Sequence, residues 1–404
     1  MKKRTGKKTV RKGVWVAALL LAGMLSACGR KTDGENGDMG ILGELEEEGE
    51  AQESTGGEAG SGTEEGMAAG DLGETNAWKE KYGENCIAEQ TFEVEISEYD
   101  GTVCFVPYAP DKEKADFHMQ IVQNDRVLTD IPGYVPTHLE GQTFGSLDAV
   151  SFYDINYDGN TDIVLIETYG DTSFAAVYYG FDNSAEEDYE KSFLMQEALS
   201  DAITDRVGTV SVSEIRALLS DGKRNGEFDS YQEAYAAVGR LCKLEGSAET
   251  EYNLIYFDED EIPELAAGDN GFYTSLYTYH DGTVYTLMDR WPYGVMGNAG
   301  YEYCPRKNSM RNYNTDYAGA ILYITYWKMG PAYTMDMVAE IRQMNFDDVN
   351  ENGVPDEEEM GSLGLYSKSY LNGREATDEE CASYDAGDYE FLTVSMSLEE
   401  LSAK

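Results

Sequence analysis

SFYDINYDGNTDIVLI (residues 151–166) places a short polar loop between two apolar runs. The residues on either side of the loop are mostly β-branched or aromatic, which is typical of strands. Within the loop, Asp, Asn and Gly are the residue types that favour tight turns. The stretch therefore predicts a strand, a tight loop and a second strand.

The loop at 154–162 also has the composition of a cation site. Oxygen-bearing side chains stand at alternate positions around Gly159: Asp154, Asn156, Asp158, Asn160 and Asp162. Calcium takes six to eight oxygens, and crowded carboxylates repel one another unless a cation neutralises them. We predict calcium in this first loop, with Asn160 offering its backbone carbonyl. The alternative is an Asx-rich turn without an ion.

A weaker copy of the stretch follows at NLIYFDEDEIPELAAG (253–268), which aligns to 151–166 without gaps. Three acids occupy the matched positions of this second loop (256–264): Asp258, Asp260 and Glu264. Tyr256 replaces the first acid and Glu261 replaces the glycine, so we expect a weak metal site or a relic loop kept for its strand pairing. Farther on, Asp281-Gly282 between two Tyr-rich runs predicts a type I′ hairpin.

DVNENGVPDEEE (348–359) satisfies the EF-hand calcium pattern. Its ligand positions 1, 3, 5, 7, 9 and 12 are Asp348, Asn350, Asn352, Val354 through its carbonyl, Asp356 and Glu359. Gly353 at position 6 permits the sharp turn. The apolar residues of about 334–346 recur at helical spacing, so a helix is expected before this third loop. The hypothesis is a half EF-hand that holds calcium, and the alternative is a solvated acidic turn.

The remaining pattern mixes strands with helices. Strand-like runs fill residues 91–180. Helical patterns follow at three places: 185–205, 212–220 and 231–245. Ser211 is the expected N-cap of the second helix, and Asp229 or Ser230 that of the third. The expected fold class is therefore α+β, with two β-rich lobes around a helical middle segment and a C-terminal half EF-hand-like loop.

The N-terminus has the order of a secretory signal. Seven Lys/Arg in residues 1–13 precede the apolar run VWVAALLLAGML, which is too short to span a membrane. The stretch Leu25-Ser26-Ala27-Cys28 resembles the lipobox of bacterial lipoproteins. In that family the chain is cut before the cysteine, which carries the lipid, so the resemblance implies a signal peptide at 1–27 and lipid on Cys28. The alternative is a plain secreted protein.

Residues 28–76 form an acidic, Gly/Glu-rich segment that cannot bury enough apolar surface to fold, so a disordered tether is expected. The chain holds 77 acidic and 30 basic residues, a net charge of −47. This charge excludes nucleic-acid binding, and it leaves membrane attachment to the lipid. Beyond the tether we expect two domains. They are a β-rich domain at 77–205 with the first loop, and an α+β domain at 206–404 with the other two.

No enzyme motif stands out, so we predict that the chain is not an enzyme. The three histidines stand in no catalytic or metal pairing: His118, His138 and His280. The five cysteines besides Cys28 show no CxxC pattern, and a Cys86–Cys104 disulfide is left open. A speculative ligand-binding cluster consists of aromatic residues: Trp291, Tyr293, Tyr301 and Tyr303. Flat aromatics can bind glycans or proteins, but half-buried tyrosines on sheet faces are the alternative.

The lipobox, FDEDEIPEL (257–265) and SYLNGREATDEE (369–380) together resemble uncharacterised surface lipoproteins of Gram-positive bacteria. The first loop resembles the calcium loops of FG-GAP and VCBS-type repeats, and the third resembles dockerin-like EF-hand loops. These resemblances imply an extracytoplasmic location on the cell membrane and supply no activity. We therefore expect a lipid-anchored calcium-binding module, with structural calcium, that binds or adheres to an extracellular protein or glycan. The alternatives are a glycan-binding lipoprotein and a structural envelope spacer.

Overall fold

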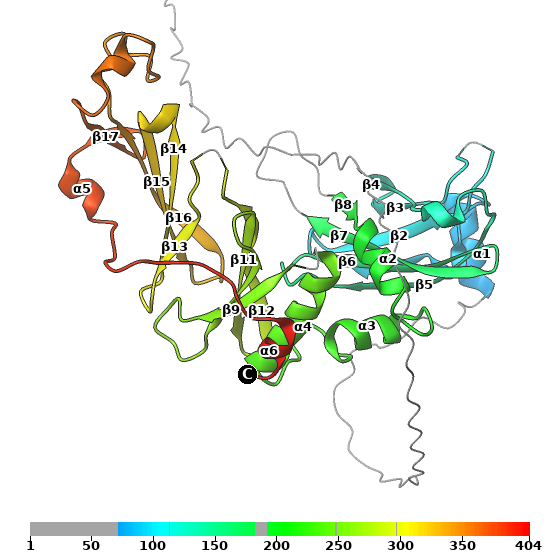
Figure 1. The fold of residues 1–404 in the computed structure, drawn as a ribbon. Coiled ribbons are helices and arrows are strands. Elements are labelled where there is room, and N and C mark those ends of the chain that lie inside the picture. Colours follow the sequence, from blue (N-terminus) through cyan, green and yellow to red (C-terminus); the bar gives the residue numbers. More distant parts are fainter. Residues whose placement is uncertain (1–71, 113, 182–191, 247–248, 296) are drawn as a thin grey trace, which may run out of the picture. The chain divides into compact units, whose positions relative to one another are not determined.

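Antiparallel strands in four sheets dominate the computed structural model (Figure 1). It describes residues 72–404 apart from 113, 182–191, 247–248 and 296. The predicted signal peptide, Cys28 and most of the predicted tether lie outside the described residues. The last residues of that tether, 72–76, belong to helix α1 (Leu72–Tyr82). Every helix in the described part of the chain is too short or too polar to cross a lipid bilayer.

The first and second sheets share one apolar core. The first has the strand order β1-β2-β3-β4: Phe92–Glu95, Thr102–Tyr108, His118–Gln123 and Arg126–Pro132. The second has the order β5-β6-β7-β8: Phe144–Tyr153, Asp162–Tyr169, Thr172–Phe181 and Ser192–Met195. Phe105 and Met119 of the first sheet pack with Leu165 and Phe174 of the second. Alternate residues of these strands therefore face a shared interior, as the strand period requires.

The third sheet packs against a layer of helices that also covers the second sheet. Its order is β12-β11-β10-β9, with β9 to β12 at Glu251–Ile255, Glu264–Asp269, Tyr273–His280 and Thr283–Pro292. The helices of this layer are α2 (Glu197–Thr204), α3 (Val212–Ser220), α4 (Tyr231–Glu245) and α6 (Leu398–Ser402). Val164 of β6, Leu241 of α4 and Leu265 of β10 belong to one core. The helical layer is thus continuous with the sheets on both sides.

The fourth sheet is the largest, with the order β18-β17-β16-β15-β14-β13-β19. Strands β13 to β16 are Tyr301–Cys304, Ser309–Asp316, Ile321–Met329 and Met335–Met344. Strands β17 to β19 are Lys368–Leu371, Arg374–Ala376 and Glu390–Phe391, with α5 (Asp378–Ala382) between the last two. Leu276 of the third sheet and Met310 of the fourth pack in one core, so these two sheets also share an interior.

Several local predictions are confirmed. Ser211 and Ser230 cap α3 and α4 by accepting hydrogen bonds from backbone N–H groups three residues on, which satisfies donors that a helix leaves open. Asp281 and Gly282 have φ of +46° and +89°, as a type I′ hairpin requires. Cys86 and Cys104 are buried in one small cluster with free thiols. Short-range signals therefore located caps and turns correctly.

The predicted fold class is wrong. In the residues that the structure describes, β-sheet dominates, with 40% strand against 21% helix, and the strands form four antiparallel sheets with few helices. The helix expected at 334–346 is strand β16, which pairs with β15 along its whole length. The third loop therefore follows a strand and leads into the short 3-10 turn η4 (Glu359–Ser362), so no half EF-hand is formed. Of the helix expected at 185–205, residues 185–191 lie outside the described residues, Ser192–Met195 form a strand paired with β7, and only Glu197–Thr204 are shown as helix α2.

The two aligned stretches adopt the same structure. Tyr153 lies opposite Asp162 where β5 pairs with β6, and Ile255 lies opposite Glu264 where β9 pairs with β10. The same register continues through the four residue pairs that follow in each sheet. The first and second loops therefore join the first two strands of equivalent antiparallel meanders, and their residues can be compared position by position.

Candidate metal centre

A buried carboxylate closes each of the three acidic loops. In each loop it accepts a hydrogen bond from the backbone N–H of the second loop residue. The pairs are Asp162 with Ile155 (2.7 Å), Glu264 with Phe257 (2.7 Å) and Glu359 with Val349 (2.8 Å). The exposed fractions of the three acids are 0%, 0% and 6%. Burying a carboxylate is costly unless its charge is compensated, so the surroundings of each acid decide what the loop can do.

In the first loop, backbone N–H groups of the protein donate hydrogen bonds to the carboxylate oxygens of the acids. Asp154 accepts from the backbone N–H groups of Asp158 and Gly159, both at 3.2 Å. The second oxygen of Asp162 accepts from the backbone N–H of Gly180 at 2.9 Å. Burial raises the pKa of Asp154 to about 6, and burial also raises the pKa of Asp162 well above its usual value. Gly159 has φ of +86°, which explains the glycine at this turn.

A residue far away in the sequence holds the first loop in place. Asn225, between α3 and α4, donates from Nδ2 to Asp154 Oδ2 at 3.0 Å. The same side chain accepts from the backbone N–H of Val284 on β12 at 2.8 Å. Thr286 of β12 donates its backbone N–H to the Tyr157 carbonyl at 3.0 Å. Sequence reasoning missed Asn225 because no local pattern links it to a loop that lies 71 residues away.

The second loop brings three acids together. One ligand oxygen from each of Asp258, Asp260 and Glu264 lies within 4.8 Å of the other two. Within the described residues, no other group of three or more acidic, histidine or cysteine side chains comes this close. The three acids could therefore hold a metal ion. The second loop, which matches the calcium pattern least well in sequence, is therefore the loop whose carboxylates lie closest together.

The protein itself satisfies these acids only in part. Asp258 accepts from the backbone N–H of Asp260 at 3.0 Å, and Asp260 from that of Ile262 at 2.7 Å. The second oxygen of Glu264 has a long contact of 3.4 Å with the Thr278 hydroxyl. Burial raises the pKa of Glu264 to about 8, against the opposing effect of its backbone hydrogen bond, and Asp258 raises it further. A bound cation would reverse this balance, because it favours the charged carboxylate.

An open cavity of about 540 Å³ adjoins the second loop. Its walls are Asp258, Glu259, Asp260, Lys307 and Asn308. Tyr256, which stands where the first loop has an acid, lies 4.3 Å beneath the Arg306 guanidinium. Arg306 also donates to the Asp260 carbonyl at 2.9 Å. Tyr256 therefore makes a cation–π contact where the first loop has a potential metal ligand. The cavity exposes Asp258 and Asp260 to solvent.

The third loop repeats the internal hydrogen bonds of the first. Asp348 accepts from the backbone N–H groups of Asn352 and Gly353, at 3.1 and 3.0 Å, as Asp154 does in the first loop. The other predicted ligands bond within the loop: Asn350 to Asp356, Asn352 to Val354, and Asp356 to Glu358 and Glu359. Arg342 also donates to the Gly353 carbonyl. These oxygens are therefore satisfied locally, without three acids meeting at one point.

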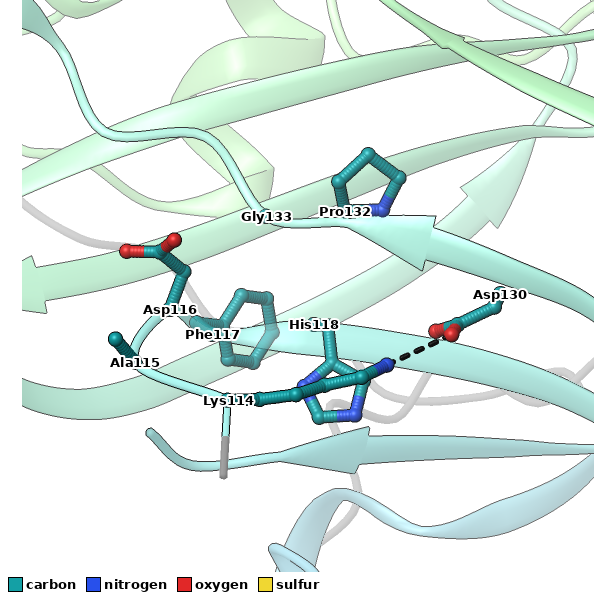
Figure 2. Close-up of a pocket in the computed structure, with 8 residues that line it drawn as sticks. All are labelled: Lys114, Ala115, Asp116, Phe117, His118, Asp130, Pro132 and Gly133. Atoms are coloured by element: carbon teal, nitrogen blue, oxygen red, sulfur yellow. Dashed lines mark hydrogen bonds and ion pairs between the residues drawn. The ribbon is translucent and has the colours of Figure 1, made fainter. Parts of the chain in front are cut away.

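A pocket of about 310 Å³ opens at the first sheet (Figure 2). In it the Lys114 ammonium reaches Asp130 Oδ2 at 2.7 Å, an ion pair drawn as a dashed line. His118 stacks on Tyr108 with ring centroids 4.9 Å apart, and burial lowers the pKa of His118, so its ring is neutral at neutral pH. The described residues that line the pocket include no Ser, Thr or Cys beside His118.

The predicted aromatic cluster packs into the core between the third and fourth sheets. Trp291 contacts Tyr301 and Trp327, with ring centroids 5.5 and 5.4 Å apart. Tyr301 and Tyr303 are buried, and Tyr293 packs against the same core. This arrangement favours half-buried sheet aromatics, the alternative stated above. A ligand-binding role for these four residues stays a prediction.

No protein-family model matches this chain, and no curated protein matches it. The lipobox resemblance and the extracytoplasmic location stay predictions.

Proposed function

We propose that the chain is a lipid-anchored, extracytoplasmic calcium-binding module whose task is binding or adhesion. The convergence of Asp258, Asp260 and Glu264 within 4.8 Å is the observation that carries the metal part of this proposal. Calcium would act there as a structural ion by neutralising carboxylates that the fold packs together at the start of β10. The hydrogen bonds that the protein donates to these acids leave part of their negative charge uncompensated. A bound cation would therefore stabilise the folded loop.

The donor set favours calcium over other divalent cations. The second loop offers carboxylate oxygens without histidine or thiolate, which argues against zinc. Calcium accepts six to eight oxygens in irregular geometry, whereas magnesium demands a small and nearly ideal octahedron. The polar positions of the first and third loops also alternate as calcium loops do. These two loops are proposed as further calcium sites, with ligands contributed by Asp154 and Asp348 among others.

The proposed location suits weak calcium binding. A signal peptide at 1–27 and lipid on Cys28 would place the folded part outside the cytoplasm, where calcium is abundant. Extracellular modules bind calcium with Kd of about 10⁻⁴–10⁻³ M. At ten times Kd, one site would add about 1.4 kcal/mol to the free energy of unfolding. This is enough to stabilise an acidic fold whose net charge of −47 favours self-repulsion.

Thermal melting of the full chain in calcium and in chelator tests the proposal. Calcium should raise the melting midpoint, and magnesium at equal concentration should raise it less. Glu264→Gln should lose most of this gain, because it removes the buried carboxylate from the group. Glu259→Gln is the matched control, since Glu259 lines the same cavity but does not belong to the three-acid group. A midpoint that does not change with calcium would refute the proposed calcium site.

A further inference from the structure

Glu167 lies in the second half of β6, inside the core shared by the first and second sheets. Its side chain has no exposed surface, and neither carboxyl oxygen has a hydrogen-bond partner. Its partners across the sheet are Leu147 of β5 and Phe174 of β7, both members of the same apolar core. A carboxyl group is therefore enclosed between cross-strand partners that offer only hydrocarbon and an aromatic ring.

The groups around Glu167 do not stabilise a negative charge. Titratable neighbours are tyrosines: Tyr169 on β6 and Tyr178 on β7, whose hydroxyl donates to the Pro132 carbonyl at 3.2 Å. The apolar side chains that the first sheet contributes to this core include Phe105 and Met119. Asp116 and Tyr134 act on these two tyrosines and not on Glu167. Burial alone raises the pKa of Glu167 well above its usual value.

An ionised carboxylate without a partner is far too costly to keep in an apolar core, so the folded protein holds Glu167 with its proton. We propose that Glu167 is a proton-dependent lock between the first and second sheets, which are firmly packed while it is protonated and loosen when it ionises. This inference does not rest on calcium binding. Glu167 lies outside the acidic loops, so its effect can be separated from the titration of Asp154, Asp162 and Glu264, whose pKa values burial also raises.

The direction of the pH effect follows from the two states of the carboxyl group. Unfolded Glu167 titrates near its ordinary pKa of 4.5, and folded Glu167 titrates higher. The stability that the proton provides is therefore complete below pH 4.5 and is lost as pH rises towards the folded pKa. Across this window, one linked proton changes the unfolding equilibrium constant by up to about tenfold per pH unit.

Urea unfolding and amide hydrogen exchange of the full chain, from pH 5 to pH 8 in chelator, test the lock. Glu167→Gln keeps the shape without an ionisable group, and Glu167→Met fills the site with an apolar chain. Glu95→Gln is the matched control, because Glu95 lies exposed on β1 of the first sheet. Since all variants share the other buried acids, differences from the wild type isolate Glu167.

Both Glu167 variants should gain stability over the wild type as pH rises, by up to about tenfold per pH unit in the unfolding constant. Peptides that cover β6 and β7 should exchange faster at pH 8 than at pH 5 in the wild type, after correction for intrinsic rates. The same peptides in Glu167→Met should show no such difference, whereas Glu95→Gln should behave as the wild type does. Wild-type and Glu167→Met curves that stay parallel across this range would overturn the lock.

Discussion

The first and second loops have the same strand register and the same closing hydrogen bond, yet they treat their acids differently. In the first loop, backbone N–H groups and Asn225 occupy the oxygens of Asp154 and Asp162. In the second loop, Glu264 keeps one strong hydrogen bond, and its carboxylate converges with Asp258 and Asp260 beside an open cavity. The first loop is the more complete sequence pattern, and the second is the more convergent group of carboxylates.

This difference shows that counting ligand-type residues is a poor guide to where a fold needs a cation. A polar loop with many oxygens also offers many ways to satisfy them internally, because Asx side chains bond the backbone two residues on. The acid lost at Tyr256 and the glycine lost at Glu261 remove part of that internal network from the second loop. A bound cation stabilises a loop in proportion to the negative charge that hydrogen bonds leave uncompensated, and not to the number of oxygens present.

The largest expected effect comes from removing the closing carboxylate of each loop. Asp162→Ala leaves the buried N–H groups of Ile155 and Gly180 without acceptors and should cost about 3 kcal/mol in the free energy of unfolding. Glu264→Ala removes the acceptor of the Phe257 N–H and the long 3.4 Å contact with the Thr278 hydroxyl, and should cost about 1.5 kcal/mol without calcium. Urea unfolding in chelator measures both values. A greater loss for Glu264→Ala would show that the two closing acids do not differ as described.

A smaller effect should follow from cutting the long-range support of each loop. Asn225→Ala removes the bonds to Asp154 and Val284 and should cost about 2 kcal/mol, since these groups are partly buried. Arg306→Ala should cost less than about 1 kcal/mol, because the Arg306 side chain is 41% exposed. Differential scanning calorimetry in chelator compares the two variants. Equal shifts in the melting midpoint would argue that the first loop is no more firmly fixed than the second.

Part of this molecule was predictable from local sequence. The 151–166 pattern and its copy gave the correct strands, because alternating apolar residues and a polar turn define both the register and the loop. The caps at Ser211 and Ser230 were also correct, since a capping side chain acts within its own first turn. In each case the interaction that decides the structure lies within a few residues of the signal.

Other features depend on partners that are far away in the sequence. Residues 334–346 have helical apolar spacing, but pairing with β15 on one side and β17 on the other overrides that weak preference. The sequence named Asp258, Asp260 and Glu264 as a weak metal site, but their convergence within 4.8 Å depends on the folded loop and could not be read from the incomplete pattern. Glu167 reads in the sequence as one acid within an apolar strand, and only packing of the first sheet against the second reveals its isolation.

The smallest expected effect tests whether the second loop can be converted towards the first. Tyr256→Asp restores the acid that the alignment places at position 1, so it should raise calcium affinity about tenfold, or about 1.4 kcal/mol. The substitution also removes the contact with Arg306, which costs about 0.5–1 kcal/mol of metal-free stability. Isothermal titration calorimetry therefore measures the affinity better than a melting shift does.

Tyr256→Phe is the matched control for this conversion, because it keeps the aromatic ring over which Arg306 lies and adds no ligand. Its calcium affinity should equal that of the wild type. Should Tyr256→Asp bind calcium no more tightly than Tyr256→Phe, position 1 of the second loop does not face the ion. The three acids would then act with ligands from the cavity side, where the described lining residues include one neutral side chain, that of Asn308. That result would show that the two loops differ in which positions supply ligands to the ion, and not only in their residues.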